Sequence, residues 1–251
     1  MINSPDHRDE FLKRGYVVIE RFLSSERLLE LQQNIDRYIA EVVPKLPSSE
    51  AFYQHAGKPE SLRQLQRMER DSFFDAYRSD RQWTELAETL LGEPVLAGLP
   101  EWFNKLPGGH PTPPHQDNHY FQLSPPQVVT MWLALDDIDE ENGALRYVPG
   151  SHRMGRRPHQ TTKVVGFSQG ITNYGPDDHA EEQLVCMQAG DLVVHHGETI
   201  HRAEPNIASN RQRRAFAMVF RGVSCKEDCL GRKEYETDLA RQHTGAGITM
   251  S

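Results

Sequence analysis

The stretch VVTMWLALDDIDEENGALRYVPG, residues 128–150, decides the fold class. Two runs of β-branched, aliphatic and aromatic residues, 128–135 and 144–150, flank a polar segment that ends in Gly143, the residue type that a tight reversal needs. Comparable runs lie at 95–103, 115–123, 183–188, 191–196 and 214–222. Short strands separated by turn signals predict a sandwich or small barrel, with residues 93–222 as its core.

The first 92 residues are predicted to be mainly helical and to support that core. Apolar residues recur at helical spacing, between polar caps and terminating glycines, in the segments 4–15, 24–43 and 80–92. A short strand is expected at 16–22, between the first two helices. The protein is therefore expected to be mainly β with flanking helices.

Two further segments lack a clear period. Residues 151–182 are polar and rich in Gly, His and Arg, and a long irregular insertion of this kind predicts a lid. Residues 223–251 are charged and are expected to form a peripheral tail with a short or frayed helix. Because no low-complexity linker divides the chain, a single domain over residues 1–251 is predicted.

The composition excludes several classes of function. The formal net charge is -8 over 251 residues, whereas a nucleic-acid or anionic-membrane surface requires a concentrated basic face. No apolar run reaches the roughly 20 residues of a membrane helix, and the N-terminal residues lack the apolar core of a signal peptide. Three cysteines are too few for a disulfide framework. We therefore expect a cytoplasmic protein that acts on a small molecule, without nucleic-acid or membrane partners.

The segment PPHQDNHYF, residues 113–121, contains two histidines and an aspartate within five residues. A lone His-x-Asp pair is usually an ordinary solvated pair, so its meaning depends on the rest of the chain. If the segment is a strand, His115 and Asp117 project from the same face, because side chains alternate between the faces of a sheet. This is the geometry for two ligands of one metal.

A third ligand is available in GDLVVHHGETIHRAEPN, residues 190–206, which contains His195, His196 and His201. We prefer His201 because it follows the predicted strand and a short turn, beside the beginning of an expected loop at the end of the sheet. Two histidines and one carboxylate leave positions open on an octahedral iron, as in non-haem Fe(II) oxygenases. Those positions would accept O2 and a co-substrate.

A co-substrate such as 2-oxoglutarate would need a fixed cation for its far carboxylate. The segment NIASNRQRRAFAMVF, residues 206–220, supplies Arg211, Arg213 and Arg214 directly before an apolar run. Arginine suits this role because its planar guanidinium can donate two parallel hydrogen bonds to a carboxylate and keeps its charge.

These residues lie within longer segments that resemble a known family. PPHQD, MWLALDDIDEENGALRYVPGSH, and GDLVVHHGETIHRAEPN with the following RRA are similar to the phytanoyl-CoA dioxygenase family of iron- and 2-oxoglutarate-dependent oxygenases. FLKRGYVVIERFLSSERL is similar to the N-terminal helix, strand and helix of that family, so the resemblance covers roughly residues 8–222. It implies a double-stranded β-helix core, which is a jelly roll of the cupin type.

The resemblance implies His115, Asp117 and His201 as the iron ligands and catalytic residues. It also implies Arg213 as the anchor of 2-oxoglutarate, because this arginine precedes an alanine by two residues, as in the Arg-x-Ala of the family. The segment between His201 and this arginine is one residue longer than is usual in the family, so Arg211 remains an alternative.

Two neighbouring positions are also informative. Trp132 matches an aromatic residue that lies near the co-substrate in relatives. Ala203 replaces a serine that relatives often carry, which would remove one hydrogen bond to the co-substrate.

The implied reaction uses Fe(II), 2-oxoglutarate and O2 to hydroxylate an unactivated C–H bond of a small organic substrate, with succinate and CO2 as co-products. In related halogenases a small residue replaces the carboxylate ligand, so the presence of Asp117 favours hydroxylation or another chloride-free oxidation. Two alternatives remain: a non-oxidative metal-dependent enzyme of the cupin type, either a hydrolase or an isomerase, and a non-catalytic jelly roll that binds a ligand.

Candidate substrate-binding residues lie near the ligands and in the expected lid. Asn118, His119 and Tyr120 follow the ligands directly, and strand alternation would place His119 on their face. Arg156 and Arg157 either form a solvated turn or hold an anionic group of a substrate. The expected lid favours a small polar or anionic substrate, but neither its identity nor the oligomeric state follows from the sequence.

Overall fold

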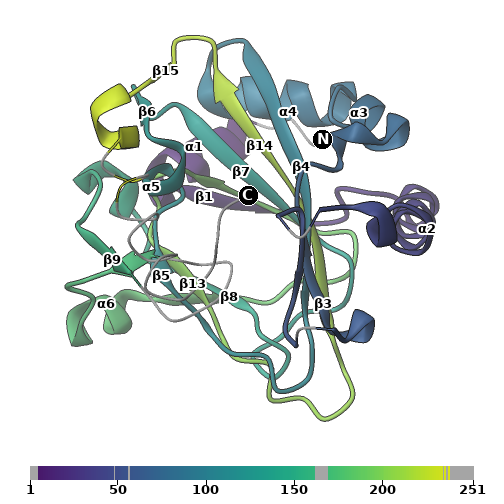
Figure 1. The fold of residues 1–251 in the computed structure, drawn as a ribbon. Helices are drawn as coiled ribbons and strands as arrows, with labels where there is room; N and C mark the ends of the chain where they lie inside the picture. The colour runs from purple at the N-terminus through teal and green to yellow at the C-terminus, as the bar shows by residue number, and fades with distance from the viewer. Residues whose placement is uncertain are drawn as a thin grey trace.

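Two antiparallel β-sheets face each other in the computed structural model, which describes residues 5–47, 49–55, 57–161, 169–233, 235 and 237 (Figure 1). The larger sheet has the strand order β1 (Tyr16–Ile19), β12 (Leu192–His196), β7 (Val128–Ala134), β14 (Arg213–Gly222), β4 (Val95–Lys105), β3 (Leu62–Leu65) and β2 (Ala51–Tyr53). The smaller sheet has the order β11 (Gln183–Val185), β8 (Leu145–Tyr147), β13 (His201–Ala203) and β5 (Thr112–His115). This arrangement confirms the expected jelly roll.

The strands of the larger sheet present alternate residues to two different layers, because successive side chains point to opposite faces. Along β14, Phe216, Met218 and Phe220 belong to the hydrophobic cluster that includes the helices, whereas Ala215 and Ala217 face the smaller sheet. Both faces are covered, which explains why every residue of β7 is buried. The small alanines leave space between the two sheets, and the candidate site lies there.

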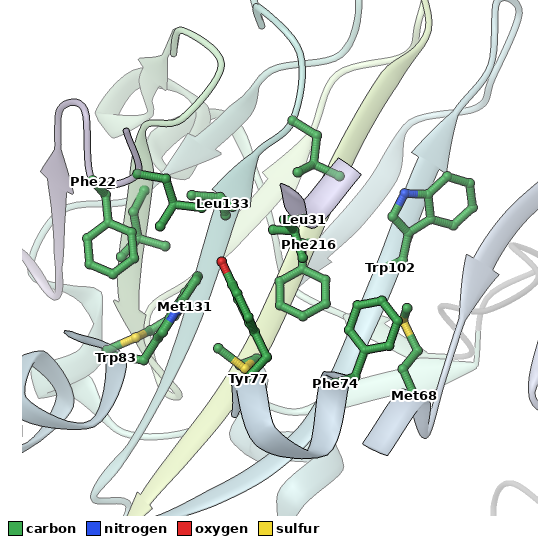
Figure 2. Close-up of a cluster of buried hydrophobic side chains, with 14 of the residues drawn as sticks. Phe22, Leu31, Met68, Phe74, Tyr77, Trp83, Trp102, Met131, Leu133 and Phe216 are labelled. Carbon is green, nitrogen blue, oxygen red and sulfur yellow. The ribbon is translucent and has the colours of Figure 1, made fainter. Parts of the chain in front are cut away.

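Four α-helices pack their apolar sides into the cluster on the outer face of the larger sheet: α1 (Pro5–Arg14), α2 (Ser25–Glu41), α3 (Ser72–Tyr77) and α4 (Arg81–Leu91). Figure 2 shows this cluster, in which Phe74, Tyr77 and Trp83 surround Phe216 of β14. The predicted caps are present: Ser24 and Asp80 accept backbone hydrogen bonds at the starts of α2 and α4. The helices expected from periodicity and capping are thereby confirmed.

The N-terminal segment also contributes two strands that the helical prediction missed. β2 and β3 pair with each other, and β3 pairs with β4, so they extend the larger sheet at one edge. They are only three and four residues long and show no apolar alternation that could be recognised in the sequence. Short 3-10 helices lie around them and after α2: η1 (Val43–Lys45), η2 (Pro59–Ser61) and η3 (Met68–Arg70).

The strand expected over residues 115–123 is wrong beyond His115. Asp117 has helical backbone angles, φ -60° and ψ -35°, and a single turn, α5 (Asn118–Phe121), follows it. The Asn118 side chain accepts a hydrogen bond from the backbone N–H of Leu123 and donates one to the carbonyl of the same residue. Such local bonds compete with a strand ladder and close the turn. His201 begins β13, and the loop expected beside it starts directly after this three-residue strand.

The described part of the expected lid contains short elements. These are η4 (Ser151–Met154), the hairpin of β9 (His159–Thr161) with β10 (Gln169–Ile171), and α6 (Pro176–Glu181). Residues 162–168 of the expected lid lie outside the described residues, and closure over the site remains a prediction. In the tail, β15 (Lys226–Glu227) pairs with β6 (Leu123–Ser124), and residues 229–233 are helical, as expected. Within the described ranges, no helix has both the length and the apolar character that spanning a membrane requires.

Candidate metal centre

Three possible metal ligands converge between the two sheets, although they come from segments far apart in the sequence. His115 ends β5, and His201 begins β13 directly opposite it in the antiparallel ladder. Asp117 joins them from the turn that follows β5, with Oδ1 3.5 Å from Nε2 of His115 and 3.7 Å from Nε2 of His201. The ligating atoms of the three residues lie within 4.8 Å of one another, a spacing that one metal ion can bridge.

Both imidazoles have a fixed orientation. The Nδ1 atom of His115 lies 2.8 Å from the carbonyl oxygen of Pro113, and the Nδ1 atom of His201 lies 3.0 Å from that of Thr199. A carbonyl can only accept, so Nδ1 of each ring carries the proton and Nε2 keeps its lone pair for a metal. Hydrogen bonds of this kind are typical of histidine ligands and set their tautomer.

The carboxylate of Asp117 is held by two further residues: His195, one of the three histidines considered as a third ligand, and Thr130, which was not among the candidates expected from the sequence. Its Oδ2 accepts a hydrogen bond of 2.5 Å from Oγ1 of Thr130 and lies 2.9 Å from Nε2 of His195. Nδ1 of His195 in turn lies 3.0 Å from the hydroxyl of Tyr147. Oδ2 is thus occupied by donors, whereas Oδ1 faces the two histidine ligands.

The protonation states also suit a cation. Burial alone would raise the pKa of Asp117, but the imidazoles of His201, His115 and His195 hold it well below its usual range. Burial lowers the pKa of His201 well below its usual range, so this imidazole is neutral near pH 7. A buried carboxylate beside the Nε2 atoms of two imidazoles, with no Lys or Arg ion pair to it among the described residues, is a donor set that a divalent metal completes.

A cavity of about 310 Å3 opens beside these ligands. Both sheets and the turn after β5 contribute to its wall, which includes Tyr120, Trp132, His195 and Arg213. Every second residue of β4 from 99 to 105 lines the cavity, because side chains alternate between the faces of a strand. These residues are Leu99, Glu101, Phe103 and Lys105. These residues were not among the candidates expected from the sequence, although their alternate spacing along a predicted strand was visible in it.

Arg213 lies inside this cavity, and Arg211 does not. Arg213 is 5% exposed, its guanidinium carbon lies 5.1 Å from the ring centroid of Trp132, and its Nε atom is buried without a hydrogen-bond partner among the described residues. Burial lowers its pKa to about 10, which leaves it charged at neutral pH. Arg211 instead pairs with Asp139 and Glu141 on the surface.

The buried, incompletely bonded guanidinium of Arg213 fits a carboxylate that approaches through the cavity. A buried polar group without a partner is costly, so its partner is expected to be a ligand. The third arginine of the cluster, Arg214, is engaged by Asp136. The methyl group of Ala203 lines the cavity where a hydroxyl would have supplied a further donor.

The remaining candidates have different surroundings. Tyr120 lines the cavity, whereas Asn118 is buried in its own turn. His119 stacks on His159, with ring centroids 4.0 Å apart, and contacts Gln169. It is oriented by the helical turn and not by strand alternation.

The two lid arginines are engaged with protein groups and do not line the cavity. Arg156 donates a hydrogen bond of 2.5 Å to Gln122, and Arg157 forms an ion pair with Asp178 at 2.6 Å. These contacts explain both side chains without a substrate.

Comparison with known proteins agrees with this geometry. The family model described as Phytanoyl-CoA dioxygenase (PhyH) matches residues 11–215. The chain is 26% identical to a protein of Stutzerimonas stutzeri named probable alpha-ketoglutarate-dependent hypophosphite dioxygenase, over 83% of this chain and 75% of that protein. It is also 26% identical to a phytanoyl-CoA dioxygenase of Arabidopsis thaliana, over 89% of this chain and 90% of that protein.

A solved structure shares the fold. The epimerase SnoN from nogalamycin biosynthesis, in complex with Fe3+, alpha ketoglutarate and nogalamycin RO, superposes with a TM-score of 0.72 and 21% identity. The match covers 92% of this chain and 88% of SnoN.

Proposed function

This chain belongs to the phytanoyl-CoA dioxygenase family and thus to the iron- and 2-oxoglutarate-dependent oxygenases, and we propose that it hydroxylates a C–H bond of a small organic substrate. Succinate and CO2 would be the co-products. The observation that carries the proposal is the cluster of His115, Asp117 and His201, in which the carboxylate ligand is retained beside a cavity.

We assign the three clustered residues as ligands of Fe(II). The fixed tautomers of both histidines and the ionised state of Asp117 support this assignment, because each presents a lone pair or a negative charge toward the centre. His195 and Thr130 are assigned as positioning residues, since they hold the oxygen of Asp117 that faces away from the histidines.

We assign Arg213 as the residue that binds the far carboxylate of 2-oxoglutarate. Its burial, its position over Trp132 and the lack of a hydrogen-bond partner for its Nε among the described residues support this role. The surface ion pairs of Arg211 explain that arginine without a ligand. When bound, iron and 2-oxoglutarate supply the oxidising power that O2 alone lacks toward a C–H bond. The protein orients both and shields them from water within the cavity.

We propose hydroxylation in preference to other oxidative outcomes. SnoN is named an epimerase, so relatives of this fold also direct oxidation to other outcomes. The retained Asp117 favours hydroxylation over halogenation, because chloride would need the position that the carboxylate takes. A hydrolase or isomerase with the same ligands, or a non-catalytic binding protein, would not explain why the buried Nε of Arg213 has no partner among the described residues.

A cytoplasmic location likewise stays a prediction. The free thiols of Cys186, Cys225 and Cys229 are compatible with a reducing compartment. Cell fractionation would test this location.

An anaerobic titration tests the function. Protein with Fe(II) and 2-oxoglutarate should develop a weak visible charge-transfer band, and admission of air should produce succinate. Candidate substrates should then be screened for stimulated succinate formation, and each product should be analysed by mass spectrometry for one added oxygen atom. A desaturated, cyclised or epimerised product would refute hydroxylation but not the cofactor assignment, whereas absence of both band and succinate would refute that assignment.

A further inference from the structure

Glu101 introduces a carboxyl group into the cavity. It lies in β4, a strand with neighbours on both sides, and is paired with Ala217 of β14. The cavity that Glu101 lines also contains Asp117 and Trp132, so the carboxyl group shares its space with the candidate metal centre. No part of the proposed iron and 2-oxoglutarate site uses it.

Among the described residues, the carboxyl group of Glu101 has no counter-charge. Its hydrogen bond comes from Nε2 of Gln64 on β3, at 3.3 Å to Oε2, and none of the ion pairs among the described residues includes it. Its charged neighbours, Asp117 and Glu69, are both acidic. Burial raises the pKa of Glu101 to about 7, which is the expected response of a carboxyl group without a compensating cation.

The cations that line the same cavity are engaged or do not reach this carboxyl group. Nζ of Lys105 donates to the carbonyl oxygen of Glu204 at 2.6 Å, and Arg202 pairs with Glu182. Arg63 of β3 has no ion pair with Glu101 among the described residues. Arg213 is the proposed partner of 2-oxoglutarate.

A second acceptor lies beside the carboxyl group. Gln64 is 4% exposed, and because its Nε2 donates to Glu101, its Oε1 remains buried without a partner among the described residues. Incompletely satisfied acceptors at the wall of a cavity require donors, and the part of the chain that the structure describes supplies too few. A ligand with several N–H donors and a positive charge would satisfy both the hydrogen bonding and the charge.

We propose that Glu101 binds a cationic nitrogen of the substrate, such as a primary ammonium or a guanidinium group, and thereby selects a basic small molecule for oxidation. This inference rests on the proposed function, which requires the reacting carbon of the substrate to lie between Glu101 and the iron ligands. It differs from the expectation of an anionic substrate, because the lid arginines that suggested an anion are engaged with protein groups. The cavity of about 310 Å3, shared with 2-oxoglutarate, limits the substrate to a small one.

Binding of three probes with one carbon skeleton tests the inference: hexylamine, hexan-1-ol and hexanoate. Calorimetry is performed anaerobically on the full chain loaded with Fe(II) and 2-oxoglutarate. The Kd for hexylamine should be at least tenfold lower than that for either other probe. Glu101→Gln keeps the size of the side chain and an acceptor for Gln64 but removes the charge, and it should abolish the preference. Glu88→Gln, an exposed position on α4, is the matched control and should retain it.

Equal affinity for the three probes, no binding of hexylamine, or an amine preference that persists in Glu101→Gln would overturn the inference. If Glu101→Gln does not fold, Glu101→Met provides the same comparison, and the wild-type probe series decides on its own. The charge-transfer band is recorded before any probe is added, so failure of the proposed function is seen separately. In that case the same calorimetry on the metal-free protein still decides whether Glu101 binds the amine.

Discussion

His201 lies directly opposite His115 in the antiparallel pair of β13 and β5, and the centroids of the two rings are 4.2 Å apart. The ladder thus sets the distance between two side chains that are far apart in the sequence. A slip of one residue in this register would turn one ring to the other face of the sheet. Asp117 lies beyond the ladder, so its position depends on the turn and on the residues that hold its carboxylate.

Removal of that carboxylate should abolish metal binding. We expect Asp117→Ala to lose the charge-transfer band and substrate-stimulated succinate formation, because two imidazoles alone provide no negative charge for Fe(II). An anaerobic titration followed by visible absorption measures this. Asp177→Asn, an exposed position in the first turn of α6, should bind iron like the wild type. Undiminished iron binding by Asp117→Ala would refute the ligand assignment.

The contact of His195 with Asp117 should have a measurable effect on the affinity of the site for Fe(II). His195→Phe removes the group within 2.9 Å of Oδ2, and we expect the Kd for Fe(II) to rise about 10- to 100-fold, as for other residues that orient ligands. His195→Gln, which restores an N–H donor, should recover part of this loss. His196→Phe, on the opposite face of β12, serves as the control. If all three variants bind iron equally well, His195 has only a packing role.

The elements that positioned this site differ in how well the sequence predicted them. Their caps and periodicity predicted α2 and α4. The His-x-Asp motif and a distal histidine predicted the three clustered residues, whose role as iron ligands stays a prediction. The prediction that strand alternation brings His115 and Asp117 together was wrong. A helical turn brings them together, because the side chain of Asn118 forms hydrogen bonds with the backbone of Leu123.

Other features depend on partners that no local pattern reveals. His195 reaches Asp117 because β12 pairs with β7 in a register that sets His195 opposite Thr130, the second donor to the same oxygen. The isolation of Glu101 likewise depends on which side chains its neighbouring strands present. Alternation along β4 places Glu101 on the cavity face, but the lack of a counter-charge for Glu101 among the described residues is a property of the assembled sheet.

Substitutions of Arg213 and of Arg211 should differ clearly in their effects on KM for 2-oxoglutarate. Arg213→Ala should raise KM for 2-oxoglutarate about 30-fold or more, because loss of one partner of a buried charge pair costs roughly 2 kcal/mol or more, and 1.4 kcal/mol is tenfold. Arg213→Lys should recover only part, since it cannot donate the paired bonds of a guanidinium. Arg211→Ala should leave this KM unchanged because its ion pairs are exposed. The opposite pattern in succinate-release kinetics would assign the anchor to Arg211.

The carboxyl group of Glu101, which forms no ion pair among the described residues, should also affect the pH dependence of stability. Its pKa is about 7 in the folded protein against an ordinary value of 4.5, so between these values the folded state holds a proton that the unfolded state releases. The free energy of unfolding therefore includes a contribution that is complete below about pH 4.5 and is lost as the pH rises through about 7. Glu101→Gln does not titrate and should lack this loss.

Urea unfolding of the metal-free protein at pH 5 and pH 8 measures this contribution, because bound iron would lower the pKa of a nearby carboxyl group. On raising the pH, the wild type should lose on the order of 2 kcal/mol more than Glu101→Gln, since each pKa unit is worth about 1.4 kcal/mol. Comparison with the variant cancels the other titrating groups, and Glu88→Gln should follow the wild type. Parallel losses in the wild type and Glu101→Gln would show that Glu101 is already compensated in the free protein, and a cationic ligand would then be unnecessary.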